Sequence, residues 1–205
     1  MRNQLRVPLS IATLVAIGAC ALPGCGGSTT GTASAGKVSG TVDGATLDVA
    51  SVLVATGASE TSPTSSSGQY YAVLVTNRAE LTCSYVQDPS SNKNFANRVL
   101  LTLTVYNAAG DVAAGTYPVV TGTTGEPASG AQAEYETSTA SCQDGLDLSA
   151  TSGSITLTEA SASGVSGSYA VTFGASGTFT GSFSAPICAQ PDGGGGSSGP
   201  TACQP

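Results

Sequence analysis

Residues 164–186 read GVSGSYAVTFGASGTFTGSFSAP, and this stretch decides the fold. Its even-numbered positions outside the central loop hold small or polar residues, so the stretch alternates with the period of two that is typical of half-buried strands. The glycine-flanked residues 174–177 form a natural hairpin loop between the two runs. We therefore predict two antiparallel strands that turn their odd-numbered residues toward a core. The large apolar residues at those odd positions are Val165, Tyr169, Val171, Phe173, Phe179 and Phe183.

The stretch SGSITLTEA, residues 152–160, continues this pattern on the N-terminal side. Ile155 and Leu157 alternate there with serine and threonine. Together with the hairpin it predicts a three-stranded antiparallel meander. Gly167 and Gly181 fall on the inward face, where a missing side chain leaves room for a neighbouring aromatic ring or marks a bend.

Further β-rich runs precede the meander, with turn residues about every ten positions. Two of them, YYAVLV and VLLTLTVY, are apolar on both faces, which predicts central strands that are covered on both sides. We expect one all-β domain of about nine or ten strands, built as an antiparallel β-sandwich or a β-barrel-like sheet. The runs are residues 37–44, 46–56, 68–77, 97–107, 115–120 and 131–139.

One segment departs from the strand pattern. In NRAELTC, residues 77–83, Asn77 is placed as an N-cap and Glu80 follows three residues later, which is the spacing of a capping box. This predicts one short helical turn that carries Cys83.

The N-terminal segment has the features of a targeting sequence. Arg2 and Arg6 precede an apolar run over residues 7–17, and small residues lead into the cysteines of IGAC and LPGC. The run is shorter than the roughly 20 apolar residues that a permanent membrane span needs. The segment resembles the lipobox of bacterial lipoproteins, in which a peptidase cuts before a cysteine whose sulfur carries a diacylglycerol.

Two cysteines compete for that role. The sequence at Cys20 is nearer to the family pattern, because the proline in LPGC is unusual there. Cleavage before Cys20 would leave an odd number of cysteines in an oxidising compartment. Cleavage before Cys25 leaves an even set of four, so we favour Cys25 as the lipid anchor and keep Cys20 as the alternative. The remaining cysteines are Cys83, Cys142, Cys188 and Cys203.

The resemblance also implies a location. The protein is expected to be exported and held on a membrane by its lipid, facing outside the cytoplasm. The residue after the anchor is Gly26, and not the aspartate that retains lipoproteins in the inner membrane, which implies the outer membrane if the source is Gram-negative.

Four regions follow from these features. A signal peptide over residues 1–24 precedes the lipidated cysteine and a flexible Gly/Ser/Thr tether over 25–36. The all-β domain covers 37–190, and a Gly/Ser-rich low-complexity tail covers 191–205. The motifs GTY, SGSITLT and GSFSAPIC in the domain loosely resemble uncharacterised, predicted envelope lipoproteins of bacteria, and this resemblance implies no activity.

The four domain cysteines can pair in three ways. Cys188 ends the last strand and Cys203 lies in the tail, which can fold back. Cys83 and Cys142 both lie beside turn signals. We therefore expect the disulfides Cys83–Cys142 and Cys188–Cys203.

Composition limits the partners. Charged residues make up only 9% of the chain, far below the usual quarter, so Ser, Thr, Asn and Gln must supply most of the polar surface. Thirteen acidic residues outnumber the basic ones, and nucleic acid is excluded because phosphate binding needs clustered basic residues. After removal of the signal peptide the basic residues are Lys37, Arg78, Lys93 and Arg98.

The residue inventory argues against an enzyme. The chain has no histidine, which removes the Ser-His and Cys-His mechanisms and the commonest general base near neutral pH. Glu134 and Glu136 lie two apart and so share a face of a strand. Tyr135 between them suits an inward position, so we expect the two glutamates on a solvated outer face. We expect no catalytic residues and no cofactor.

Two acidic turns could supply oxygen ligands to calcium. One holds Asp144 and Asp147, and the other holds Asp88, Asn92 and Asn94. Neither has the regular spacing of a calcium loop, and the same residue types are what turns are made of. We expect no metal site.

The sequence thus favours a lipid-anchored β-domain of the cell envelope that acts as a structural or binding module. Its expected partners are the membrane, through the anchor, and an envelope protein or a small molecule. The alternative is a lipocalin-like carrier of a small apolar ligand. A filled core would favour the module, and an open cavity lined by side chains would favour the carrier.

Overall fold

The computed structural model describes residues 36–59, 68–84, 93–121, 128–188 and 202–204. These residues form an all-β domain, as the sequence predicts, and a short 3-10 turn lies in the loop of the predicted hairpin. The elements are β1 (Lys37–Val42), β2 (Ser51–Ser59), β3 (Gly68–Thr76), β4 (Lys93–Phe95), β5 (Val99–Asn107), β6 (Gly115–Pro118), β7 (Ser129–Ser138), β8 (Asp144–Ser149), β9 (Ser152–Ser161), β10 (Gly164–Thr172), η2 (Gly174–Ser176), β11 (Gly177–Cys188) and β12 (Ala202–Gln204).

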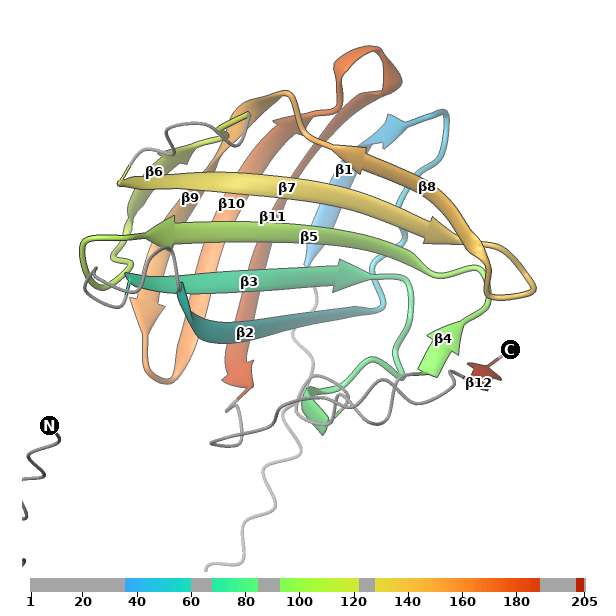
Figure 1. The fold of residues 1–205 in the computed structure, drawn as a ribbon, viewed down its shortest axis with the longest axis horizontal. Helices are drawn as coiled ribbons and strands as arrows, with labels where there is room; N and C mark the ends of the chain where they lie inside the picture. Colours follow the sequence, from blue (N-terminus) through green and yellow to red (C-terminus); the bar gives the residue numbers. More distant parts are fainter. Residues whose placement is uncertain (1–35, 60–67, 85–92, 122–127, 189–201, 205) are drawn as a thin grey trace, which may run out of the picture. The chain divides into compact units, whose positions relative to one another are not determined.

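Ten strands form one curled sheet in the order β6-β9-β10-β11-β2-β3-β5-β7-β8, with β1 also paired to β11. A short parallel pairing joins β11 to β2 through Ile187↔Val54 and Cys188↔Ala55. In Figure 1, β9, β10 and β11 run steeply behind β2, β3, β5 and β7, so the two halves of the sheet face and cross each other.

The two halves also meet at a second place. Val119, just after β6, forms an isolated parallel bridge with Ala131 of β7. The amide of Val120 donates a hydrogen bond to the Ala131 carbonyl over 2.9 Å. The sheet is therefore barrel-like, with its halves linked at two corners.

The meander is present as predicted. β9, β10 and β11 pair antiparallel, η2 occupies the hairpin loop, and all six large apolar residues of the deciding stretch are buried. Gly167 lies opposite Phe183, and Tyr169 lies opposite Gly181. A Cβ added at Gly167 would approach the Phe183 ring to 2.9 Å, and one at Gly181 would approach the Tyr169 hydroxyl to 2.6 Å. Both glycines therefore make room for an aromatic neighbour, as expected.

Aromatic rings fill the space between the two halves. Tyr135 of β7 is fully buried, and its ring centroid lies 5.5 Å from that of Phe179 on β11. Phe173 lies 6.0 Å from Tyr135 and 6.3 Å from Phe179, which closes the cluster. Because pairs of rings at these distances attract beyond their buried area, this cluster holds one half of the sheet to the other.

A second, smaller apolar cluster lies on the outer face of β2 and β3. Leu81, in the segment after β3, packs there with Leu53, Phe95 and Cys188, and Leu74 of β3 adds to it. The hydroxyl of Ser51 donates to the Leu81 carbonyl over 2.9 Å and fixes the segment. The outer face of β3 is thus covered near Leu74, while Ala72 on the same face stays partly exposed.

The capping box does not form, although Cys83 and Ser84 do have helical conformation. The side-chain oxygen of Asn77 accepts a hydrogen bond from the Val99 amide over 2.8 Å, and its nitrogen donates to the Asn97 carbonyl over 3.0 Å. The side-chain oxygen of Asn77, which would have capped a helical turn, therefore extends the pairing of β3 with β5 instead.

The predicted disulfide pairing is wrong: the bonds are Cys83–Cys188 and Cys142–Cys203. The segment carrying Cys83 folds over the outer face of β2, and the β11–β2 pairing brings Cys188 to the same place.

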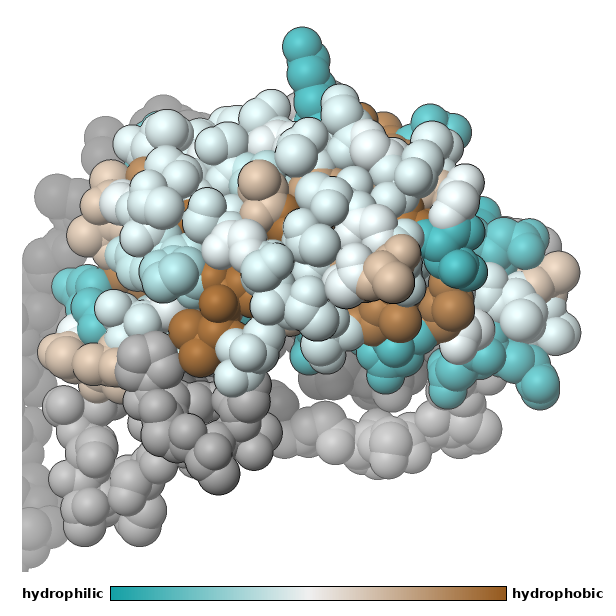
Figure 2. Space-filling model, turned by 90° about the horizontal axis from the view of Figure 1, so that it is seen from above, coloured by the Kyte–Doolittle hydropathy of each residue, from teal (hydrophilic) through white to brown (hydrophobic). Residues whose placement is uncertain are grey.

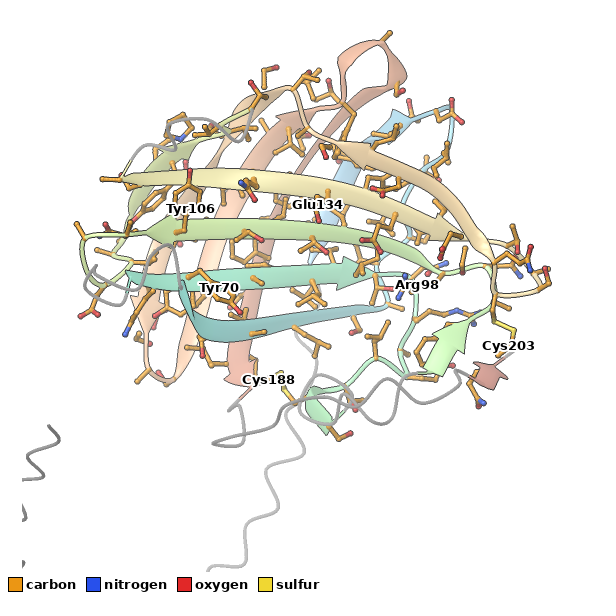
Figure 3. The ribbon with its side chains drawn as sticks, in the orientation of Figure 1. Tyr70, Arg98, Tyr106, Glu134, Cys188 and Cys203 are labelled. Atoms are coloured by element: carbon orange, nitrogen blue, oxygen red, sulfur yellow. A yellow bond between two sulfur atoms is a disulfide. The ribbon has the colours of Figure 1, made fainter. Side chains whose placement is uncertain are left out.

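The second bond depends on β12, which pairs parallel with β4, a pairing that no feature of the sequence predicts. The turn with Cys142 lies beside β4, because the Asn97 amide bonds to the Thr139 carbonyl over 3.0 Å. Cys188 and Cys203 lie apart in Figure 3.

Pairs of hydroxyl groups lie on neighbouring strands on the outer face of β6 and of the meander. Thr116 pairs with Thr156 at 3.0 Å, Ser166 with Ser184 at 2.9 Å, and Thr172 with Thr178 at 2.9 Å. The surface in Figure 2 is accordingly pale over most of its area, with the strongly hydrophilic residues gathered mainly toward one side. Within the described residues, none of the helical segments has the length and apolar character that a membrane span requires.

Candidate functional site

The carboxylate pair singled out in the sequence lies on the outer face of β7. Tyr135 between them points into the core, as expected. Glu134 is exposed, and Figure 3 shows it on the sheet surface apart from Arg98. Glu136 forms an ion pair with Arg98 at 3.2 Å and is 37% exposed. The pair is therefore not enclosed in a pocket of the kind that glycosidase chemistry would need.

The acidic turns do not assemble a cation site among the described residues. Asp144 and Asp147 are exposed on β8. Asn94 lies in β4, whereas Asp88 and Asn92 lie outside the described residues. No group of three or more metal-ligating side chains was found in the part of the chain that the structure describes.

The two candidate anchor cysteines, Cys25 and Cys20, also lie outside the described residues. The other four predicted site residues are all in disulfides, although in the pairing given above. Two disulfides are typical of proteins that fold in an oxidising compartment.

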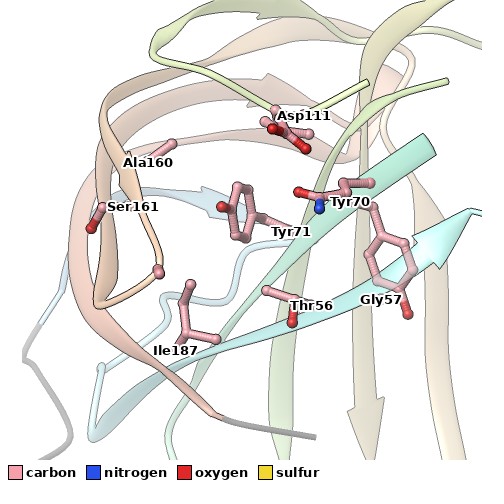
Figure 4. A pocket seen from close by; sticks show the side chains of 11 residues that line it. Thr56, Gly57, Tyr70, Tyr71, Asp111, Ala160, Ser161 and Ile187 are labelled. Carbon is pink, nitrogen blue, oxygen red and sulfur yellow. The ribbon is translucent and has the colours of Figure 1, made fainter. Parts of the chain in front are cut away.

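A cavity of about 590 Å³ lies at one end of the domain. Five segments contribute to it: the end of β2, the start of β3, the loop after β5, the turn between β9 and β10, and the end of β11 (Figure 4). Pockets of this size suit small organic ligands. The lining residues are Thr56, Gly57, Gln69, Tyr70, Tyr71, Asp111, Val112, Ala160, Ser161, Ala162 and Ile187.

The inner part of the cavity continues the apolar core. Tyr71 on β3 lies opposite Thr56 on β2. Only 8% of the surface of Tyr71 and 3% of that of Val112 is exposed. Figure 4 shows the Tyr71 ring pointing into the cavity, with Ile187 below it, while Tyr70 points away on the other side of the strand. A ligand would therefore rest against Tyr71.

The outer part is held in place by hydrogen bonds within its loops. The side chain of Asn107 donates to the Asp111 carbonyl over 2.9 Å and accepts from the Ala109 amide over 3.1 Å. The backbone N–H of Gln69 donates to the Gly110 carbonyl over 3.3 Å, which connects the loop after β5 to β3. Asp111 is thereby fixed at the exposed rim.

The opposite wall is the turn between β9 and β10. The Ser161 hydroxyl donates to the Gly164 carbonyl over 3.1 Å and closes this turn. Ala160 and Ala162, on either side of Ser161, present only methyl groups to the cavity. This wall is therefore shaped by short side chains and leaves the space open.

Among the described residues that line the cavity, Asp111 is the only charged one. Burial, and to a lesser degree the Asp111 carboxylate, raises the pKa of the Tyr71 phenol. Tyr71 consequently stays protonated across the physiological range and can both donate and accept a hydrogen bond. The site combines the Asp111 carboxylate, the neutral Tyr71 phenol, small apolar side chains, and the polar side chains of Thr56, Gln69 and Ser161.

A second cavity, of about 390 Å³, lies between the segment after β6, the middle of β7 and the junction of β8 with β9. Val120, Gln132, Glu134 and Thr151 are among its lining residues. It is smaller, and the aromatic rings of the core do not reach it.

Sequence reasoning missed the cavity beside Tyr71 because its lining comes from segments more than 100 residues apart. A lone Asp111 in the turn AAGD and a Tyr pair at the start of a strand carry no recognisable spacing. No family model matches the chain, and no curated protein or solved structure is significantly similar to it.

Proposed function

We propose that this chain is an exported, lipid-anchored and non-catalytic binding module of the cell envelope, which holds a small ligand in the cavity lined by Tyr71 and Asp111. The observation that carries this proposal is the 590 Å³ cavity at the end of a sheet whose centre is filled by the aromatic cluster. Rigid strands position its walls, and rigid scaffolds are what binding sites need.

The filled interior favours the module over the lipocalin-like carrier. A carrier encloses its ligand between the sheet walls. Here that space holds Tyr135, Phe173 and Phe179, with ring centroids 5.5–6.3 Å apart. The cavity is confined to one end, where a ligand would remain partly in contact with solvent.

The lipid anchor is supported by the N-terminal sequence. Exposure to an oxidising compartment is supported by the two disulfides. A non-catalytic role is supported by the absence of histidine from the chain.

The anchor is tested by intact mass spectrometry of the protein purified from membranes. We expect a mature chain that begins at Cys25 and carries the mass of its acyl groups. A chain beginning at Cys20 would replace the assigned anchor by the alternative. A water-soluble form without lipid mass would contradict anchoring.

Binding in the cavity is tested with Thr56→Phe. Thr56 lies on the inward face of β2 and lines the cavity, so a phenyl ring there would occupy the ligand's space. Calorimetric titration of benzyl alcohol into the full chain in lipid nanodiscs, with empty nanodiscs as the blank, should show binding that Thr56→Phe weakens at least about tenfold.

The matched control is Thr180→Phe, which places the same ring on the exposed outer face of β11. Its affinity should equal that of the unmodified chain. Should Thr56→Phe fail to fold, Ala162→Phe in the exposed turn fills the cavity from the rim. Equal binding by the cavity-filled and control variants would refute the proposed site.

A further inference from the structure

We infer that the ligand of this cavity is a small organic cation, with an ammonium group carried on an apolar or aromatic body. This inference rests on the proposed function, because it names the chemical class that the same cavity selects. Three features of the lining carry it.

The first feature is an uncompensated negative charge. Asp111 lies at the rim, and the described lining residues include no basic side chain. The ion pair between Arg98 and Glu136 is the only one in the described part of the chain, so the Asp111 carboxylate has no basic partner there. A carboxylate in that position attracts a cation and repels an anion.

The second feature is the aromatic surface beside that carboxylate. Figure 4 shows Asp111 next to the Tyr71 ring, which projects into the cavity. A cation placed over the face of a tyrosine is attracted by the negative face of the ring, and the attraction is strongest where water is excluded. Only 8% of Tyr71 is exposed, so protein atoms cover most of the ring and a cation would meet the part of it that borders the cavity.

The third feature is the group of apolar side chains beside Tyr71. Val112, Ala160 and Ile187 line the cavity together with the polar side chains of Thr56, Gln69 and Ser161. The apolar side chains offer contact to methyl or ring carbons, so the carbon atoms of an organic ammonium would be buried against them.

The test compares three probes of similar size: benzyltrimethylammonium, benzyl alcohol and benzoate. Each is titrated calorimetrically into the full chain in neutral lipid nanodiscs at low salt. We expect the cation to bind about tenfold more tightly than the alcohol, and benzoate to bind most weakly. Added salt should reduce the preference for the cation.

Asp111→Asn keeps the size of the side chain and removes its charge. It should weaken binding of the cation about fivefold or more and change binding of benzyl alcohol less than about twofold. Asp147→Asn on the exposed face of β8 is the matched control and should leave both affinities unchanged. Tyr71→Leu should also weaken the cation more than the alcohol, because the ring face is lost.

The outcomes separate the two claims. If benzyl alcohol binds and Thr56→Phe abolishes that binding, but the cation has no advantage or Asp111→Asn has no effect, the cavity is a ligand site and the inference of a cation is wrong. If no probe binds in a manner sensitive to Thr56→Phe, the proposed function itself fails.

Discussion

Replacement of Phe179 by alanine is expected to lower the free energy of unfolding by about 3–5 kcal/mol. Phe179 is fully buried on β11, and its ring packs against Tyr135 across the domain and against Phe173 beside it. Truncation would remove buried apolar area and leave a cavity between the two halves of the sheet, which the backbone strands can close only in part. Chemical denaturation monitored by circular dichroism gives the change.

The matched control is Thr180→Ala on the same strand. Thr180 faces solvent, so its replacement should change stability by less than about 0.5 kcal/mol. Similar losses for both variants would mean that the assignment of faces is wrong, because a shift of one residue exchanges the buried and exposed sides of a strand.

Removal of the Cys83–Cys188 disulfide is the second large effect. The two cysteines are 105 residues apart, and the chain-entropy model assigns about 4.7 kcal/mol to a loop of about 100 residues. We therefore expect the double variant Cys83→Ser, Cys188→Ser to lose about 4 kcal/mol or more of stability. Cys188 also packs in the outer apolar cluster, so serine there adds the cost of a buried hydroxyl.

The pairing itself is checked by peptide mapping without reduction. The map should contain one peptide pair joining Cys83 to Cys188 and another joining Cys142 to Cys203. A peptide that joins Cys83 to Cys142 would contradict the path of the segment after β3. A double variant as stable as the parent would show that the apolar cluster alone holds this segment.

Period-two alternation made the meander predictable. The hairpin at residues 174–177 and the alternation around it are local signals, and burial of one face requires no knowledge of the partner strand. The cover over the outer face of β3 near Leu74 was also predictable, since apolar residues on both faces of a strand favour cover on both. For β5 the outward Thr102 and Thr104 remain partly exposed.

Contacts between distant segments were not predictable. Asn77 has the right neighbours for a capping box, yet its side chain bonds to Val99 because β3 and β5 pair beyond their regular ends. The disulfide partners depend on the parallel pairings of β11 with β2 and of β12 with β4. No local sequence signal predicts a pairing of only two or three residues between strands that are so far apart in the sequence.

The cavity is unpredictable for a related reason. Its walls are strand ends and turns. Asp111 lies in the loop after β5 and Ala160 at the end of β9, and only the curl of the sheet brings them together. The charge and the aromatic ring that define its chemistry are ordinary residues in sequence. They become a site only through position.

The measurement that tests the ligand site most directly is photo-crosslinking with a diazirine derivative of benzyl alcohol, followed by mass spectrometric mapping of the adducts. The probe is neutral, so the result does not depend on the inferred charge of the ligand. We predict adducts in the peptides that contain Tyr71, Asp111 and residues 160–162, and their loss in Thr56→Phe but not in Thr180→Phe. Adducts centred on Tyr135 and Phe179 in the domain interior, or adducts unaffected by Thr56→Phe, would contradict a binding module with its site at the end of the sheet.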